Sequence, residues 1–334
     1  MKIKKLGEDH IIDKIRETFR TGHPRIIKSI GDDTSVTAIT EKRCLLLTID
    51  SLIEGVHFKK DYTPPYYIGR KAVSISVSDI AAMGGTPLFL LTAISMPEDT
   101  DFELVEELYR GIKDSIADYG IHLVGGNTSK AESLSITTTL VGEADKHKVV
   151  YRSGAKPEDV IYITGTTGDS ALGLEILSEE GIAALENVSY REAVLKHLNP
   201  VARVGMARAL AEKGLAHAMI DVSDGLVRDL GHITEQSNVG AIIECERLPL
   251  SQEMLDYPRN RDHKLWLALT GGEDYELLFT SPPEKKDAVE LLARRLNIRV
   301  TPIGIVTEGK GTKVLDRGEE LAIDTSQGYQ HFVS

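Results

Sequence analysis

The chain has 334 residues and a formal net charge of −12, with 41% hydrophobic and 27% charged residues. These proportions are close to globular averages and argue against disorder, a fibrous structure or a membrane span, while the acidic balance argues against nucleic-acid binding, which depends largely on Lys and Arg. A chain of this length usually divides into two domains with separate cores, so we expect a two-domain enzyme.

The first half predicts helices and strands in alternation. Ile11, Ile12, Ile15 and Phe19 recur at helical spacing within residues 7–19, which indicates an amphipathic helix rather than a signal peptide. The segments that follow predict, in order, a strand over 44–50, a helix over 66–83, a strand over 88–95, a helix over 103–119 and strands over 122–124 and 134–143. This order indicates a mixed α and β domain.

The second half repeats the alternation after a polar stretch at residues 145–148, so we predict domains over 1–150 and 151–334. A strand over 160–164 leads into a glycine loop, helices near 171–177 and 201–213, and a strand that ends at Asp221. No GxxxxGK[ST] loop occurs in the sequence, so an ordinary P-loop is not favoured.

Acidic residues stand at the ends of apolar segments, where an unpaired carboxylate would be costly. Asp32 and Asp33 follow Gly31 in a turn that, by itself, would be read as solvated. In the next strand, side chains alternate, so Thr48 and Asp50 share one face and Leu45, Leu47 and Ile49 the other. Two oxygen ligands therefore point the same way, unless that face simply meets water.

Asp79 lies four residues after Ile75 and seven after Ala72, which places it on a largely apolar stripe of the predicted helix. A carboxylate there needs a cation. Lys71, another base or metal ions could supply the charge.

Further acids follow in the second half. Asp221 stands at a strand end, and Ser223 or Asp224 is a natural N-cap for the helix that begins near Leu226, which leaves the other residue free for a ligand. Glu273 and Asp274 lie in a double-glycine turn before a strand. Several carboxylates near glycine turns suit several Mg²⁺ ions bound to a polyphosphate, because Mg²⁺ prefers oxygen ligands and keeps substrate phosphates in its shell.

The two cysteines, Cys44 and Cys245, lie far apart in the sequence. They imply neither a disulfide framework nor a thiolate metal site, and they favour a reducing cytoplasm.

The motifs GDDTSV, TIDSLIEGVHF, SVSDIAAMGG, GGNTS, YRSGA, TGDSALGL, IDVSDGL, TGGEDYELLF and GYQHF occur in the order found in thiamine-monophosphate kinases. The chain resembles that family over nearly its whole length. The resemblance implies the α/β (α+β) fold of aminoimidazole ribonucleotide synthetase, with an N-terminal domain that binds ATP and Mg²⁺ and dimerises through its sheet, and a C-terminal α/β domain. It also implies ATP-dependent, direct in-line phosphorylation of thiamine monophosphate to thiamine diphosphate, by a cytoplasmic homodimer.

The resemblance further implies roles for particular residues. The expected metal site comprises Asp32, Asp33, Thr48, Ile49 (through its carbonyl), Asp50, Asp79, Asn127, Asp221 and Asp224, and the expected catalytic residues are Asp50, Asp79 and Asp224. The expected nucleotide contacts are Gly125, Gly126, Asn127, Arg152 and Ser223, and the expected contacts to thiamine monophosphate are His57, Glu273 and Tyr329.

One position departs from the family. The usual GGDT motif reads Gly125, Gly126, Asn127, Thr128, so an amide oxygen replaces a carboxylate and one metal ion loses a charged ligand. Two alternatives remain at this stage: another ATP-using member of the superfamily, similar to aminoimidazole ribonucleotide synthetase, or a catalytically silent dimer that binds nucleotide. Product analysis and ADP release that depends on thiamine monophosphate would separate them.

Overall fold

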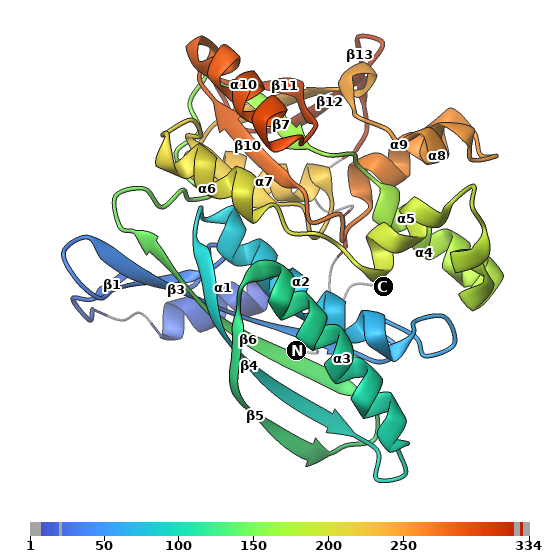
Figure 1. Ribbon diagram of the computed structural model, residues 1–334. Helices are drawn as coiled ribbons and strands as arrows, with labels where there is room; N and C mark the ends of the chain where they lie inside the picture. Colours follow the sequence, from blue (N-terminus) through green and yellow to red (C-terminus); the bar gives the residue numbers. More distant parts are fainter. Residues whose placement is uncertain (1–7, 20–21, 324–327, 330–334) are drawn as a thin grey trace.

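The computed structural model describes residues 8–19, 22–323 and 328–329. The strands of these residues form two sheets, each accompanied by helices (Figure 1). None of the described helices is long and apolar enough to span a bilayer. Of the GYQHF motif, Gly328 and Tyr329 are among the described residues, and the last three residues lie outside them.

The first sheet has the strand order β1-β2-β3-β6-β4-β5. The elements of this part are α1 (Glu8–Thr18), β1 (Ile26–Lys28), β2 (Ser35–Ala38), β3 (Arg43–Ile53), α2 (Pro65–Ala82), β4 (Thr86–Met96), α3 (Phe102–Tyr119), β5 (His122–Lys130) and β6 (Ser135–Asp145). Helices α2 and α3 pack directly against each other. Gly69 and Gly111 allow this, because a Cβ at either position would lie 1.9 Å from a backbone oxygen of the facing helix.

The second sheet has the order β13-β12-β9-β11-β7-β10-β8. Its part of the chain contains β7 (Val160–Thr164), α4 (Asp169–Glu180), α5 (Arg191–Leu198), α6 (Val204–Glu212), β8 (Ala218–Asp221), α7 (Leu226–Ser237), β9 (Gly240–Glu244), α8 (Gln252–Asp256), α9 (Arg261–Thr270), β10 (Leu277–Ser281), α10 (Lys286–Leu296), β11 (Val300–Thr307), β12 (Gly311–Asp316), β13 (Glu319–Leu321) and 3₁₀ helices Gly181–Glu186, Cys245–Arg247 and Pro283–Lys285. Strands β11, β7, β10 and the edge strand β8 pair antiparallel in that order. Asp221 therefore ends a strand in an antiparallel ladder, opposite Leu277.

The predicted elements are confirmed with small changes at their ends. The largest difference is β5, which continues past Val124 to Lys130 because it stays paired with β4 through residues 125–130. A glycine is required within that stretch, since a Cβ on Gly126 would lie 2.3 Å from the Thr92 carbonyl oxygen. The boundary near residue 150 falls between β6 and β7 and stays a prediction.

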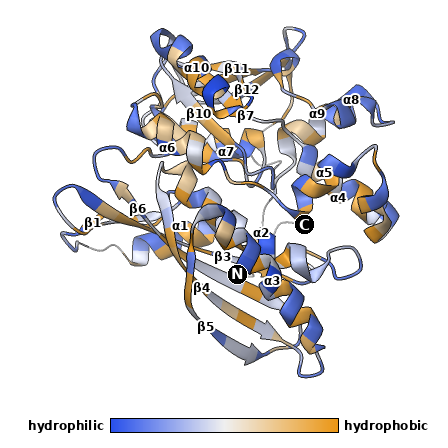
Figure 2. Cartoon of the chain, viewed as in Figure 1, coloured by the Kyte–Doolittle hydropathy of each residue, from blue (hydrophilic) through white to orange (hydrophobic). Residues whose placement is uncertain are grey.

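The two faces of the first sheet differ. On β3, Leu46 and Leu52 are buried beneath α2 on the face shared by Thr48 and Asp50, as the alternation predicts. The opposite face carries Ile49, which is 67% exposed. Figure 2 shows hydrophobic colour along these strands, and the exposed apolar residues of this sheet also include Phe89, Leu91, Leu123 and Val124.

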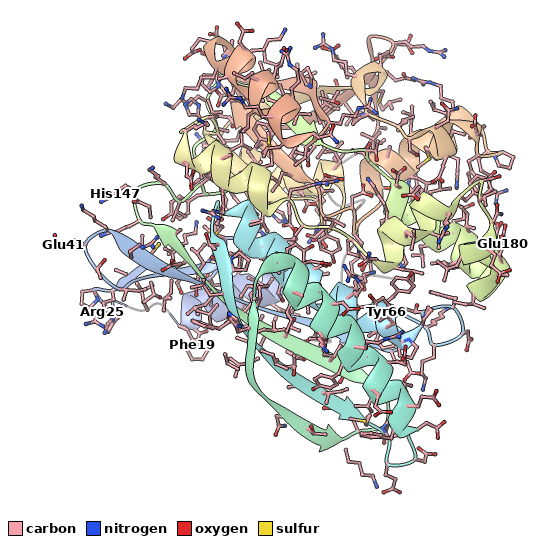
Figure 3. The ribbon with its side chains drawn as sticks, viewed as in Figure 1. Phe19, Arg25, Glu41, Tyr66, His147 and Glu180 are labelled. Atoms are coloured by element: carbon pink, nitrogen blue, oxygen red, sulfur yellow. The ribbon has the colours of Figure 1, made fainter. Side chains whose placement is uncertain are left out.

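One end of this sheet is formed by the turn between β2 and β3 and by the segment after β6. Glu41, in the turn between β2 and β3, and His147, just after β6, both lie there (Figure 3). The Lys146 N–H donates to the Lys42 carbonyl at 2.8 Å and closes this end. The acidic residues of interest lie instead where α2 faces the second sheet.

Candidate active site

Three carboxylates from separate segments meet where α2 faces β8. Asp33 precedes β2, Asp79 belongs to α2, and Asp221 ends β8; one oxygen of each lies within 4.8 Å of the others. Burial raises the pKa of Asp33 to about 6 and that of Asp221 to about 7, and it raises the pKa of Asp79 well above its ordinary value. Asp33 and Asp221 are buried and Asp79 is partly buried, and three acids this close together require compensating positive charge.

Hydroxyl groups orient the carboxylates. Thr48 Oγ1 donates to the Asp79 carboxylate. Ser76 Oγ donates to Asp50 at 2.9 Å, and Ser78 Oγ donates to Asp221 at 2.6 Å. The sequence analysis did not single out these two serines; the available signal was a run of hydroxyl residues within an otherwise apolar helix.

Arg152 supplies positive charge at one side of the cluster. Its Nη2 lies 2.6 Å from Asp33 Oδ1, and its backbone N–H donates to Asp32 Oδ1 at 3.3 Å. Asp32 also forms an ion pair with Lys28 at 3.0 Å, so it borders the cluster while its charge is matched. The other oxygen of Asp33 is buried and accepts no hydrogen bond from the described residues.

These observations fit a metal site. The donor set is carboxylate oxygen, which suits hard divalent cations. One oxygen of Asp33 remains available for a ligand, and Arg152 is the cation that contacts this cluster directly.

A cavity of about 520 Å³ is lined by residues from both halves of the chain, including Asp50 but not Asp33, Asp79 or Asp221. It brings together six predicted site residues: Asp50, His57, Ser223, Asp224, Glu273 and Tyr329. It also contains residues that the sequence analysis missed, among them Tyr62, Ser170, His197 and Tyr275. Aromatic and small polar residues of this kind carry no recognisable spacing in the sequence.

Glu273 is held tightly within this cavity. Its backbone φ of 66° is unusual for a residue with a side chain, and its N–H donates to the Ser223 carbonyl at 2.7 Å. Lys71 Nζ lies 2.7 Å from Glu273 Oε1, so the lysine considered as a partner of Asp79 pairs here instead. Burial alone would raise the pKa of Glu273, but Lys71 offsets this and lowers it, whereas burial lowers the pKa of the nearby His197 to about 3.

The loop after β8 differs from the sequence expectation. The N-cap of α7 is Gly225, so the prediction that Ser223 or Asp224 caps the helix is wrong. Instead, Asp229 in the first turn of α7 accepts hydrogen bonds from the backbone N–H groups of residues 223–225. Asp224 pairs with Arg228 at 3.0 Å, and burial raises its pKa.

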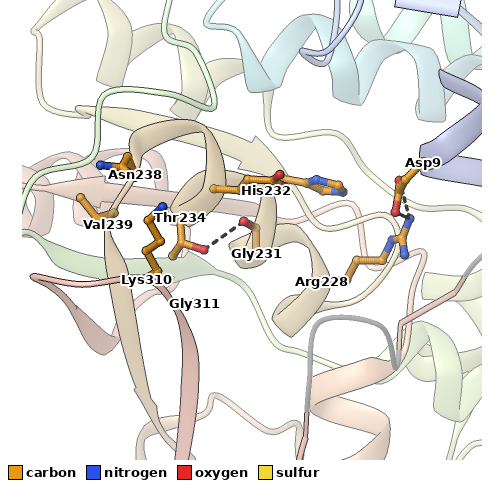
Figure 4. A pocket seen from close by; sticks show the side chains of 10 residues that line it. Asp9, Arg228, Gly231, His232, Thr234, Asn238, Val239, Lys310 and Gly311 are labelled. Atoms are coloured by element: carbon orange, nitrogen blue, oxygen red, sulfur yellow. Dashed lines mark hydrogen bonds and ion pairs between the residues drawn. The ribbon is translucent and has the colours of Figure 1, made fainter. Parts of the chain in front are cut away.

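Arg228 also links this loop to the N-terminal helix. Its Nη2 lies 3.1 Å from Asp9 Oδ1 of α1, beside a separate cavity of about 340 Å³ (Figure 4). Arg228 is thus shared between Asp224 and Asp9.

The predicted contacts on β5 lie elsewhere in the sheet. Asn127 pairs with Ala93 of β4, which pairs with Thr137 of β6, which in turn pairs with Ser51 of β3. Asn127 is therefore three strands, or about 14 Å, from β3. Alternation also places it on the opposite face of the sheet from Asp50.

Gly125 and Gly126 precede Asn127 on the same edge strand. Within one chain, the structure therefore does not bring the β5 residues to the carboxylate cluster. The roles of all these site residues stay predictions.

Comparison with known proteins agrees with this architecture. Residues 31–144 match the family model described as AIR synthase related protein, N-terminal domain, and residues 156–317 match AIR synthase related protein, C-terminal domain. A thiamine-monophosphate kinase of Aquifex aeolicus is 39% identical, with 99% of this chain and 100% of that protein covered. The Escherichia coli enzyme of the same name is 36% identical, with 98% and 99% covered.

A solved structure described as AaThiL complexed with AMPPCP and TMP matches with a TM-score of 0.86 at 38% identity, covering 99% of both chains. The fold class expected from the sequence is thereby confirmed. Full-length identity at this level shows that the chain belongs to the thiamine-monophosphate kinase family.

Proposed function

We propose that this chain transfers the γ-phosphoryl group of ATP to thiamine monophosphate and releases thiamine diphosphate and ADP. The observation that carries the proposal is the cavity in which Asp50 and Asp224 face the same space as His57, Glu273 and Tyr329. The solved structure described as AaThiL complexed with AMPPCP and TMP has the same fold over the full chain. This full-length similarity favours the kinase over a synthetase-like relative.

The cavity suits thiamine monophosphate in its charge and its aromatic lining. Thiamine carries a positively charged thiazolium ring, and the lowered pKa of Glu273 keeps a carboxylate ionised beside it. Tyr62, Tyr275 and Tyr329 line the same cavity and offer aromatic faces to a cation. The phosphate end of the substrate would then lie toward Asp50 and Asp224.

The chemistry requires little proton transfer. The acceptor phosphate has a second pKa near 6, so it is already largely a dianion at neutral pH. The main barrier is the repulsion between two anions. Bound magnesium supplies charge neutralisation for both phosphates, and we assign its ligands to Asp33, Asp50, Asp79, Asp221 and Asp224 with Thr48 and the Ile49 carbonyl.

The chain's own residues do the positioning. Arg152 brings a permanent positive charge to the edge of the carboxylate cluster, where it is available to an ATP phosphate. Ser76 and Ser78 fix Asp50 and Asp221. We therefore propose direct, in-line transfer without a phosphorylated side chain.

We also propose that the protein acts as a cytoplasmic homodimer. The outer face of the first sheet is apolar and exposed, and all residues of edge strand β5 are exposed. A second copy that covers this face would bury it, and it would bring Asn127, Gly125 and Gly126 of one subunit to the phosphate site of the other. Both cysteines are free, as expected in a reducing compartment.

The test is ADP release by the purified protein with Mg²⁺ and ATP, with and without thiamine monophosphate. We expect release to depend on thiamine monophosphate and to match the formation of thiamine diphosphate. ATP turnover without that dependence would refute the proposed acceptor.

A further inference from the structure

Asp229 makes an unusual set of contacts in the first turn of α7. Its Oδ2 accepts hydrogen bonds from three consecutive backbone N–H groups, those of Ser223 at 3.0 Å, Asp224 at 3.1 Å and Gly225 at 3.1 Å. The residue is 2% exposed. Backbone N–H groups before a helix lack partners within the helix, so this carboxylate satisfies them and fixes the direction of the loop.

The carbonyls of the same loop accept hydrogen bonds from the backbone of two residues that we predict to contact the substrate. The Ser223 carbonyl accepts the N–H of Glu273 at 2.7 Å. The Asp224 carbonyl accepts the N–H of Tyr329 at 2.9 Å. The backbone at Glu273 and at Tyr329 is therefore hydrogen-bonded to this loop, and the N–H groups of the loop are hydrogen-bonded to Asp229.

Close packing leaves this arrangement little freedom. A Cβ on Gly225, where φ is 124°, would lie 2.6 Å from the Thr270 carbonyl oxygen, and a Cβ on Gly272 would lie 2.4 Å from the Ser223 carbonyl oxygen. The loop is thus enclosed by backbone on two sides. A shift of the loop after the loss of Asp229 would move Asp224, Glu273 and Tyr329 together.

We propose that Asp229 is a positioning residue of the active site, which sets the placement of Asp224 directly and of Glu273 and Tyr329 through the loop carbonyls. The inference rests on the proposed function of the cavity. Asp229 does not line this cavity, and its Oδ2 is engaged by three backbone N–H groups, so we assign it to the positioning of the loop.

Two substitutions separate the contributions of Asp229. Asp229→Ala removes the acceptor, and we expect it to weaken magnesium binding, measured by calorimetry, and to raise the KM for thiamine monophosphate, each on the order of tenfold. Asp229→Asn keeps one acceptor oxygen without the charge, so both effects should be smaller. Buried polar groups that lose a partner also destabilise the fold, so thermal unfolding is measured in parallel.

Asp159→Asn is the matched control. Asp159 is also 2% exposed, accepts the backbone N–H of Lys156 at 2.9 Å and contacts His217, but it does not line the cavity. This variant should lose thermal stability while its magnesium affinity and its KM stay at the wild-type values.

The outcomes are distinct. Asp229 variants that lose only thermal stability, as Asp159→Asn does, would overturn the positioning role, and so would failure of both variants to fold. If the wild-type protein showed no turnover that depends on thiamine monophosphate, the proposed function would fail, yet the magnesium titration would still test Asp229. The positioning role would be supported if Asp229→Ala weakened magnesium binding and raised the KM for thiamine monophosphate more than Asp229→Asn does.

Discussion

Lys71 Nζ lies 2.7 Å from Glu273 Oε1, and this ion pair joins helix α2 of the first sheet's layer to the loop before β10 of the second. Only 3% of the Lys71 side chain is exposed. A buried lysine next to a partly buried carboxylate favours the ionised form of that carboxylate. The pair therefore fixes the charge of a residue that we assign to substrate binding.

Lys71→Met should make the KM for thiamine monophosphate depend on pH. In the wild type, the lowered pKa keeps Glu273 ionised above its ordinary value of 4.5. Without Lys71, burial raises this pKa, so Glu273 takes up a proton as the pH falls and attraction for the thiazolium ring is lost. As the pH falls below this raised pKa, the KM should rise by up to about tenfold per pH unit.

The control for this prediction is Lys113→Met, which removes an exposed lysine from α3. Its KM profile should follow the wild type, including any change caused by titration of the substrate phosphate. Identical profiles for the two variants would mean that Lys71 does not govern Glu273.

Asp50→Asn should lower kcat/KM by on the order of a hundredfold while the fold survives, because it removes a charge aimed at the phosphate site. Ser76 Oγ, 2.9 Å from the Asp50 carboxylate, can still donate to the amide oxygen. Asp145→Asn, at the end of β6 in the same sheet, is the control and should leave turnover unchanged. If Asp50→Asn stayed within a few-fold of wild type at limiting magnesium, Asp50 would not be a metal ligand.

The free energy of unfolding of the magnesium-free protein should fall as the pH rises. The pKa of Asp221 is raised from 3.8 to about 7 and that of Asp33 to about 6, so the folded state binds more protons than the unfolded chain between these values. The stabilisation is complete below about pH 3.8 and is lost as the pH passes through about 7. Thermal unfolding across this range, with chelator and with saturating Mg²⁺, measures the effect.

Magnesium should stabilise the protein most at the alkaline end, where the carboxylates are ionised without a cation. Asp221→Asn should reduce the pH dependence in chelator, since one of the titrating groups is gone. A chelator-treated protein with the same unfolding temperature at both ends of the range would contradict the raised pKa values.

Some features of these residues could be predicted from the sequence alone, and others could not. Alternation along β3 correctly placed Thr48 and Asp50 on one face, because side chains in a strand have a fixed period of two, but it left open whether that face meets water. The helical spacing of Asp79 correctly indicated a carboxylate on an apolar stripe, and Asp79 is partly buried there. Short-range periodicity thus predicted which side chains share a face.

Partners far apart in the sequence could not be predicted in this way. Lys71 pairs with Glu273 and not with Asp79, because the approach of α2 to the second sheet decides which carboxylate it reaches. The N-cap prediction failed because Asp229 satisfies the loop from within the helix. The order of the motifs also does not show that Asn127 and Asp50 lie on opposite faces of the sheet.

Direct transfer predicts inversion at phosphorus. ATP with a chiral γ-thiophosphate should give thiamine diphosphate of opposite configuration, because a single in-line displacement inverts the centre once. The configuration of the product is measured after one turnover. Retention, or a trapped phosphorylated side chain, would show that the transfer proceeds in two steps.

Asn127→Asp should lower the magnesium concentration that gives half-maximal activity and change kcat at saturating magnesium much less. A carboxylate holds a hard cation more strongly than an amide oxygen does, and at high concentration the ion is present in both proteins. Magnesium titrations of wild type and variant at fixed ATP measure the shift. An unchanged or higher midpoint would mean that position 127 meets no metal.

Asn127 is about 14 Å from β3 and on the other sheet face, so in the proposed homodimer we expect it to act on the phosphate site of the second subunit. Subunit mixing tests this with Asp50→Asn and Asn127→Lys, each expected to be inactive alone. If Asn127 acts across the dimer, one site in each mixed dimer has both wild-type residues, and an equal mixture should regain about a quarter of wild-type activity. If Asn127 acts within its own subunit, both sites of every mixed dimer carry one substitution, and no activity should return.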